Sequence, residues 1–220
     1  MIKKLLLGIF MLAGFSAFSQ SQDMGKSDPD AKKILDNVSA RFKTYKTIVA
    51  NFSLKIENSS GKVLGTKTGV VNMKGSKYRI SVAGQEIYSD GNNIWTYDKS
   101  TNEVQLTKFD ASANSITPQK MFTNFYDKDF LYKLNSETKQ GKKTIQEIEL
   151  TPLDKTKTFF KVIVEIDKSK QSIVGTKIFQ KTGDRDTYAI TSMKTNVNLP
   201  DDLFVFDAKK YPDAEVIDLR

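Results

Sequence analysis

The sequence predicts a mainly β protein with a few helices, built as a highly curved antiparallel sheet or an incomplete barrel. Two observations predict this class. After about residue 50, apolar and polar residues alternate with a period of two in one short segment after another. Turn-forming clusters rich in Gly, Asn, Asp, Ser and Lys separate these segments at similar spacings, which is typical of all-β sheets and barrels.

The N-terminus has the pattern of a cleaved secretory signal peptide. Lys3 and Lys4 precede an apolar run over residues 5–18, and Ala17 and Ser19 are small residues at the spacing that a signal peptidase reads. The run is about 14 residues long, whereas a membrane-spanning helix needs about 20. We therefore expect cleavage after Ser19 and export of the mature chain without a membrane-spanning helix.

The mature chain is expected to form one domain. Removing the signal peptide, residues 1–19, leaves 201 residues and takes away two lysines, so the net charge falls from +8 to +6. Residues 20–27 are polar and predict a flexible mature N-terminus. The remaining residues, 28–220, are long enough to bury a substantial core and show no convincing boundary or repeat.

The absence of two residue types narrows the function. The chain contains no Cys and no His, so we expect no disulfide framework, no metal site, no cofactor and no His-based catalysis. No Cys follows the apolar run, so the protein is not expected to be a lipid-anchored lipoprotein itself. Basic and acidic residues alternate without a basic and aromatic cluster, so we expect no nucleic-acid partner.

A helix is predicted near the start of the mature chain. Asp28 suits the N-cap position and Pro29 the first helical position. Apolar side chains then recur at steps of three and four residues, at Ala31, Ile34, Leu35, Val38, Phe42 and Tyr45. We predict an amphipathic helix from Pro29 to about Tyr45, one face of which needs a partner.

Strands are predicted over most of the remaining chain. They cover about residues 51–57, 66–73, 77–82, 94–97, 144–150, 158–166, 172–180, 187–196 and 203–206, roughly ten in all with shorter neighbours. The turn "SDGN" at residues 89–92 leads into the strand that holds Trp95, the only Trp, and Tyr97. The pattern is that of an antiparallel meander.

A second helical segment interrupts the strands. Thr117 and Pro118 suit an N-cap and a first helical residue, and the segment "QKMFTNFY" that follows carries Met121, Phe122 and Phe125. The next segment, "DKDFLYKL", is apolar and aromatic, and its pattern fits either a helical turn or the start of a strand.

Three pairs of close carboxylates are the only residues that suggest catalysis or a calcium site. They are Asp127 with Asp129, Asp184 with Asp186, and Asp201 with Asp202. A secreted hydrolase could use such a pair, but each pair lies among turn-forming residues, where acids commonly cap or solvate the chain. The latter interpretation is favoured, and the protein is expected not to be an enzyme.

The inward apolar residues of the strands have two interpretations. They are Phe52, Leu54, Ile56, Tyr78, Ile80, Val82, Trp95 and Tyr97. They could form an ordinary core closed by the first helix, which the periodicity alone favours, or they could line a cavity for a hydrophobic ligand.

The order of several segments resembles the LolA family of periplasmic lipoprotein carriers. The segment "IYSDGNNIWTYDKSTNEV" is similar to a family turn and strand with Trp and Tyr. Further similar segments follow in family order: "IVANFSLKI" after the early helix, "TPQKMFT", "IELTPL", "VIVEIDKSKQSI" and "FVFDAKKYPDAEVIDLR". The resemblance covers nearly all of the mature chain.

The resemblance implies a fold and a function. The fold is a half-open, strongly curved antiparallel β-barrel of about ten or eleven strands with a helical lid. Its partners would be acylated lipoproteins, an inner-membrane ABC transporter that releases them, and an outer-membrane receptor if one exists, and the carrier would be a monomer in the periplasm. A related lipid-binding or lipid-sensing envelope protein with a different cargo is the alternative.

The resemblance also implies which residues meet the lipid. The cavity would be lined by the eight inward residues named above, among which Phe52, Tyr78 and Ile80 match family positions. The lid would carry Ile34, Val38, Met121, Phe122 and Phe125. The chain departs from the family at residues 74–77, "KGSK", where relatives commonly have an Arg-Pro pair, and at Ile80, where Trp is common. Whether Lys74, Lys77 or Arg79 replaces the arginine that latches the lid is left open.

Overall fold

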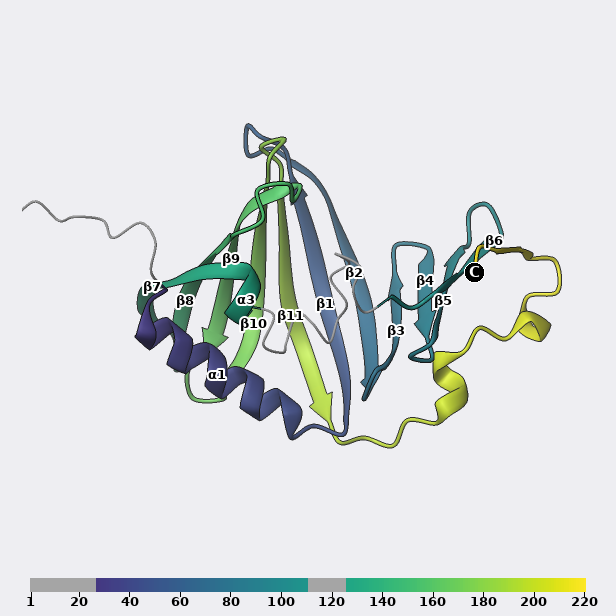
Figure 1. Ribbon diagram of the computed structural model, residues 1–220, viewed down its shortest axis with the longest axis horizontal. Coiled ribbons are helices and arrows are strands. Elements are labelled where there is room, and N and C mark those ends of the chain that lie inside the picture. Colours follow the sequence, from purple (N-terminus) through teal and green to yellow (C-terminus); the bar gives the residue numbers. More distant parts are fainter. Residues whose placement is uncertain (1–26, 111–125) are drawn as a thin grey trace, which may run out of the picture.

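The computed structural model describes residues 27–110 and 126–220 (Figure 1). The predicted signal peptide lies outside these residues, as do residues 20–26 and the predicted lid residues Met121, Phe122 and Phe125. The helices are α1 (Pro29–Lys43), α3 (Tyr126–Asp129) and the two 3-10 helices η1 (Asp201–Phe204) and η2 (Ala208–Lys210). None of the helices in the described part of the chain is long and apolar enough to cross a membrane.

Twelve strands make up one sheet in the described residues. They are β1 (Thr47–Glu57), β2 (Val63–Lys74), β3 (Lys77–Val82), β4 (Gln85–Ser89), β5 (Asn93–Asp98), β6 (Glu103–Lys108), β7 (Phe130–Gln140), β8 (Lys143–Pro152), β9 (Phe159–Asp167), β10 (Ser172–Gln180), β11 (Arg185–Thr195) and β12 (Glu215–Asp218). Their spatial order is β12-β6-β5-β4-β3-β2-β1-β11-β10-β9-β8-β7. The protein is therefore mainly β, as predicted, and β12 and β7 form the two edges of its sheet.

The predicted number of strands is wrong. The sheet has twelve strands rather than ten or eleven. The predicted ranges leave out the short strands β4, β6 and β12, which carry too few residues for a clear alternation, and also β7, whose start fitted either a helical turn or a strand. The sheet is not closed, as in the predicted incomplete barrel, since its order runs from edge to edge without a closing pair. All neighbouring strands are antiparallel except β12, which pairs with β6 in parallel.

The predicted strand at residues 203–206 is also wrong. Residues Asp201–Phe204 form the 3-10 helix η1, in which the Leu203 N–H donates to the Pro200 carbonyl at 3.3 Å. Phe204 and Phe206 are both buried, and this alternation imitates a strand. The segment packs beside the sheet without pairing with it, so alternate burial arises there without a strand ladder.

Local signals explain the ends of α1. The Asp28 carboxylate accepts a hydrogen bond from the Asp30 N–H at 2.8 Å, and Pro29 takes the first helical position. The helix ends at Lys43, two residues before the predicted end, because the Thr44 hydroxyl and N–H both donate to the Arg41 carbonyl. The segment 127–134 combines both predicted alternatives, since α3 ends at Asp129 and β7 begins at Phe130.

The strand register gives the sheet two distinct faces. On the face that α1 covers, called the inner face here, Phe52 of β1 lies opposite Gly69 of β2 and Ile190 of β11. The inner face continues through Tyr188, which lies opposite Leu54. A β-bulge between Asn51 and Phe52 changes the pairing with β11. The middle of the sheet, where β1 pairs with β11, thus joins the first strand to the last long one.

A glycine on β2 makes room for Phe52. A Cβ placed on Gly69 would lie 2.5 Å from the Phe52 ring and 2.7 Å from the Ser81 carbonyl oxygen, a backbone atom. Gly65, two strand steps along the same face, has no atom within 4 Å of such a Cβ. The inner face is therefore tightly packed at Gly69 and open at Gly65.

These two glycines give a matched pair of variants. Gly69→Ala is expected to lower the free energy of unfolding by about 1–3 kcal/mol, because the Phe52 ring and the backbone must shift. Gly65→Ala is expected to change it by less than about 1 kcal/mol. Urea unfolding followed by circular dichroism measures both, and equal effects of the two variants would contradict the packing described here.

Candidate functional site

Two apolar clusters lie on the inner face beneath α1. The first joins Ala31, Leu35 and Val38 of α1 to strands β7–β9, where Ile148, Leu150 and Ile166 are fully buried. The second joins the end of α1 to the middle of the sheet and contains Ile48, Ala50, Val71, Met73 and Tyr78, with Phe42, Tyr45 and Ile80 packed against it. Two of the predicted cavity residues, Tyr78 and Ile80, thus belong to this second cluster.

A small apolar pocket separates α1 from the sheet. Its lining includes Val38 and Phe42 of α1, Ala50 of β1, Met73 of β2 and Ile190 of β11. The volume of this pocket is about 20 Å³. Ligand pockets are typically roughly 300–1,000 Å³, so the protein's own side chains nearly fill this part of the inner face.

Beyond the end of α1 the inner face is more open. Here the side chains of Phe52, Leu54, Ile56, Val82 and Tyr188 form what we call the apolar trough. All five are only partly buried. Gly65, opposite Ile56, leaves open space beside them. Four of the five are predicted cavity residues, and the structure brings them together on one face.

Tyr188 is the trough residue that sequence reasoning missed. Its ring lies 6.3 Å from that of Phe52, centroid to centroid, and burial raises the pKa of its hydroxyl. The alternation of β11 was visible in the sequence. The bulge at Phe52 decides which of its residues face inward, and periodicity carries no sign of that bulge.

The predicted lid residues that are described do cover the inner face. Val38 is buried and lines the pocket, and Ile34 packs against the first cluster. The start of α1 is fixed to the sheet, because the Asp28 carboxylate accepts a hydrogen bond from the Leu134 N–H at 3.0 Å. Burial raises the pKa of Asp28, but hydrogen bonds from several backbone N–H groups outweigh it and hold this pKa below its ordinary value.

A polar link joins α1 to α3. The Tyr126 hydroxyl donates to Asp36 at 2.8 Å, and Lys32 lies 3.0 Å from Asp36 and 3.3 Å from Asp127. Burial disfavours the Asp36 carboxylate, but the bonds from Tyr126 and Lys32 outweigh it and lower its pKa. Burial and the nearby carboxylate raise the pKa of Tyr126.

Removal of this hydrogen bond is expected to loosen α1. Tyr126→Phe should raise amide hydrogen exchange in α1 about fivefold, because one hydrogen bond contributes about 1 kcal/mol. Tyr132→Phe is the matched control, since Tyr132 lies in the same cluster and its hydroxyl makes no hydrogen bond to the described residues. Equal exchange in α1 of wild type and Tyr126→Phe would show that the link does not hold the helix.

Trp95 and Tyr97 do not join the trough. The register puts them on the outer face, opposite to the side of Ile80, with Tyr88 directly across from Trp95. There Tyr97 packs 5.6 Å from Phe206 and 4.7 Å from Tyr211, ring to ring, so the C-terminal segment covers them. The predicted alternation was correct for this strand, but it does not say which of its two sets faces inward.

The turn before Trp95 is as predicted. The Asp90 carboxylate accepts hydrogen bonds from the N–H groups of Asn92 and Asn93 at 2.8 and 2.7 Å, and Gly91 has a φ of +95°. These bonds fix the start of β5 and its register against β4.

A buried charge cluster lies on the outer face. Glu86 accepts hydrogen bonds from Arg79 and from the Tyr88 hydroxyl at 2.5 Å each, and Lys99 lies 2.6 Å from its other oxygen. Burial opposes the charge of Glu86, but these donors outweigh it and lower its pKa to about 2. The same burial and the neighbouring carboxylate raise the pKa of Tyr88, over whose ring the Arg79 guanidinium lies at 4.9 Å.

The three cations considered as substitutes for the family arginine have other partners. Arg79 pairs with Glu86 on the outer face. Lys74 and Lys77 lie 2.9 and 3.3 Å from Asp201 at the start of η1. In the described residues these contacts hold the C-terminal segment to the sheet and do not tie down α1.

The predicted carboxylate pairs act as structural groups. Asp201 pairs with Lys74 and Lys77, Asp127 pairs with Lys32, and Asp186 accepts a hydrogen bond from Gln180 at 2.9 Å. The two lysines lower the pKa of Asp201. A lowered pKa keeps that carboxyl ionised, so it is unsuited to be a general acid. Within residues 27–110 and 126–220, no cluster of three or more acids could hold a metal ion.

Most of the sequence matches one known protein family. Residues 43–207 match the family described as outer membrane lipoprotein carrier protein LolA. A Cupriavidus necator protein named outer-membrane lipoprotein carrier protein is 27% identical over 166 residues, covering 73% of this chain and 76% of the relative. A Pseudomonas putida protein of the same name is 25% identical over 217 residues, covering 97% of both chains.

A solved structure shows a similar fold. It is that of an uncharacterized conserved protein from Thermus thermophilus, with a TM-score of 0.58 and 14% sequence identity. The alignment covers 86% of this chain and 99% of that one.

Proposed function

Because this chain belongs to the LolA family of outer membrane lipoprotein carrier proteins, we propose that its inner face holds the acyl chains of lipoproteins released from the inner membrane and delivers them to the outer membrane. The observation that supports this most is the apolar trough. Five large apolar side chains stay partly exposed there beside the open space at Gly65, although a folding core would bury them.

The energetics of acyl chains make such a carrier necessary. Exposing a methylene group to water costs about 0.8 kcal/mol, so a chain of roughly 15 methylenes costs on the order of 12 kcal/mol to move through water. A trough that covers the chain removes most of this cost. Incomplete packing also allows release, because a perfect fit would hold the cargo too tightly.

In this proposal α1 is a lid. The pocket beneath it is too small for an acyl chain, with about 20 Å³ available. Chains therefore enter along the trough and reach the pocket only if α1 or its side chains Val38 and Phe42 move away from the sheet. The link from Tyr126 to Asp36 would be the contact that this movement breaks.

Partners and location follow from the same role. The carrier would act as a monomer in the periplasm, receive lipoproteins from an inner-membrane ABC transporter and pass them to an outer-membrane receptor where one exists. No chemical step is required, so the protein would not be an enzyme.

Isolation of the loaded carrier tests the proposal. The mature protein purified from its native envelope is expected to show masses of bound lipidated proteins by mass spectrometry under non-denaturing conditions. Consistent absence of such species, even with the releasing transporter present, would count decisively against a carrier. Removal of the protein should also deplete lipoproteins from the outer membrane. Bound lipid without that depletion would favour the alternative, a lipid-sensing protein with a different cargo.

A further inference from the structure

Three loops meet at one end of the sheet, which we call the apical end. It consists of residues 55–67, 153–161 and 177–185, which contain the β1–β2, β8–β9 and β10–β11 connections. The Lys181 N–H donates to the Thr158 carbonyl at 2.8 Å. A Cβ on Gly183 would lie 2.7 Å from that of Ser59, so the β10–β11 loop also contacts the β1–β2 loop. Figure 1 shows these connections at the top of the sheet.

The apical end holds half of the strongly exposed large apolar residues among those the structure describes. Val63, Leu64, Leu153 and Phe160 are 50, 61, 50 and 49% exposed. Val63 begins a cross-strand row that continues through Glu57, Arg185, Phe179 and Lys161. In this row Phe179 lies between the basic residues Arg185 and Lys161, and Phe160 packs against Phe179 with ring centroids 6.1 Å apart.

The net charge of the domain is also concentrated there. The three apical segments contain nine Lys and Arg against three Asp and Glu, a net charge of +6. The whole chain has a net charge of +8, of which residues 1–27 contribute +2, with three Lys and one Asp. The rest of residues 28–220 is therefore neutral overall, although Asp186, next along β11, lies on the inner face beside the apical end.

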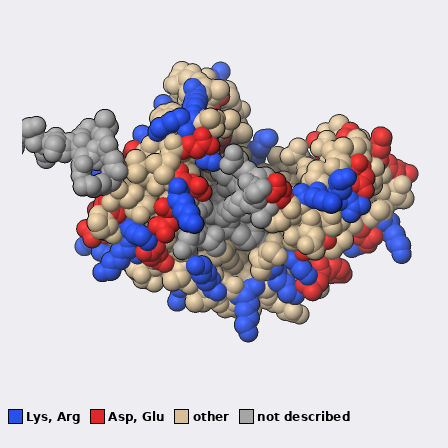
Figure 2. Space-filling view, in the orientation of Figure 1, with Lys and Arg blue, Asp and Glu red and all other residues tan. Residues whose placement is uncertain are grey.

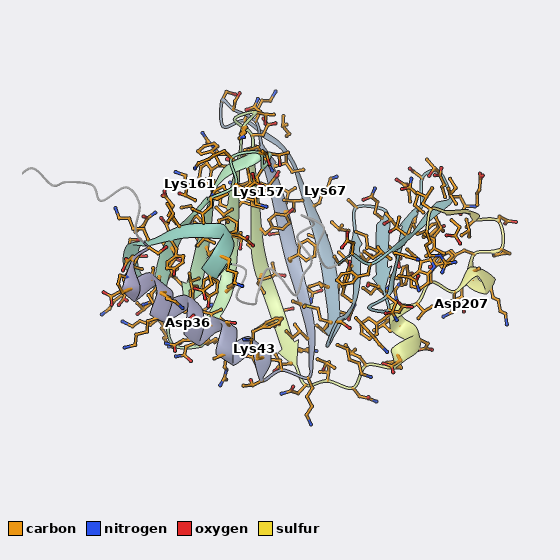
Figure 3. All side chains as sticks on the ribbon, in the orientation of Figure 1. Asp36, Lys43, Lys67, Lys157, Lys161 and Asp207 are labelled. Carbon is orange, nitrogen blue, oxygen red and sulfur yellow. The ribbon has the colours of Figure 1, made fainter. Side chains whose placement is uncertain are left out.

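Few of these cations have acidic partners. Among the described residues, Lys55 lies 3.2 Å from Glu57 and Lys161 lies 3.9 Å from Glu149, and the other seven have no carboxylate within 4.0 Å. Lys161 and Lys177 instead lie over the Phe179 ring, 4.6 and 5.4 Å from its centroid. Figure 3 labels Lys67, Lys157 and Lys161 at this end, and Figure 2 shows basic side chains over it.

We propose that the apical end docks onto a membrane surface that contains anionic phospholipids. Exposed apolar side chains among cations that mostly lack a carboxylate partner are the combination that an anionic bilayer interface binds, through apolar insertion and electrostatic attraction. The apolar trough opens toward the same end, because Ile56 lies opposite Gly65 in the apical segment. This inference rests on the carrier role proposed above and adds a partner to it: acyl chains pass between bilayer and trough with little exposure to water.

Binding to vesicles tests the docking. The mature protein, residues 20–220, is expected to co-sediment with phosphatidylcholine vesicles that contain about one third phosphatidylglycerol, and not with pure phosphatidylcholine vesicles. High salt should weaken the binding, because it screens exposed charges. Equal binding to both kinds of vesicle, or none to either, would overturn the proposal.

Matched variants localise the surface. Lys62→Glu with Lys157→Glu should lower the vesicle partition coefficient by about 25-fold or more, since each cation near an anionic surface contributes about fivefold. Lys142→Glu with Lys170→Glu makes the same charge change at the opposite ends of the strands and should have a much smaller effect. Leu64→Asp should weaken binding, whereas Leu219→Asp, at a leucine exposed to a similar extent (60%), should not.

The experiments distinguish a failure of the docking proposal from a failure of the carrier proposal. Apical variants that keep bound lipoprotein but lose vesicle binding support the docking surface as distinct from the trough. Wild-type protein that binds lipoprotein but no anionic vesicle overturns the docking while leaving the carrier role intact. Vesicle binding by a protein that holds no lipidated species would overturn the carrier role alone. Equal losses in the apical and control variants would overturn the assignment to this end.

Discussion

Replacing Leu54 by Glu is expected to lower the amount of lipoprotein bound to the purified carrier about 100-fold. Leu54 is partly exposed in the trough, so the carboxylate of the variant reaches water while the trough is empty. An acyl chain laid over it would force that group out of water, at a cost of about 3 kcal/mol. Quantitative mass spectrometry of bound lipidated species measures the loss.

Ser53→Glu is the matched control for this variant. Ser53 is the next residue on β1 and points to the outer face, opposite Thr68 and Ala189. Both variants should keep the circular dichroism spectrum of the wild type. Undiminished cargo in Leu54→Glu, or equal losses in both variants, would remove the trough as the binding site. Tyr78 is less suitable for such a test, because it is 4% exposed and a carboxylate there would disrupt the core.

Replacing Glu86 by Gln is expected to lower the free energy of unfolding by about 3 kcal/mol at pH 7 and the melting temperature by roughly 6–12 °C. Glu86 is 4% exposed and is the counter-charge of Arg79 and Lys99. The neutral amide of the variant would leave Arg79 and Lys99 without a counter-charge on the outer face. Glu215→Gln, at an exposed position of β12, should have little effect.

The pH dependence of this difference gives a second measurement. The pKa of Glu86 in the folded protein is about 2, whereas its ordinary value is 4.5. A carboxyl whose pKa is lowered on folding contributes stability above its unfolded pKa and loses it as the pH falls through the folded one. The gap between wild type and Glu86→Gln should thus be full above about pH 5 and shrink toward pH 2. A gap that does not change with pH would mean that the charge of Glu86 is not its source.

The local structure could be predicted from the sequence where short-range chemistry decides it. The start of α1 at Asp28 and Pro29 and the turn at Asp90 and Gly91 follow from side-chain and backbone preferences of neighbouring residues. Alternation also predicted the long strands except β7. The number of strands could not be predicted, because pairing such as β12 with β6 joins distant and very short segments.

Which face of each strand points inward could be predicted only in part, for a related reason. Alternation shows that a strand has two different faces, but the partner strands decide which one is inner. Phe52 and Leu54 lie on the inner face, whereas Trp95 and Tyr97 lie on the outer face beneath Phe206 and the C-terminal segment. The interpretations of core and cavity both stay predictions: side chains nearly fill the space around Val38 and Phe42, and the trough residues are partly exposed.

The pairing of β1 with β11 also sets the order in which the protein can fold. Ile48 meets Thr195 in the middle of the sheet, so the first strand waits for nearly the last one before its second edge is satisfied. Contacts between such distant residues form slowly, because a long loop must close first. During synthesis, one edge of β1 with its apolar residues therefore stays unpaired, and the newly made chain is most vulnerable to aggregation at the centre of its future sheet.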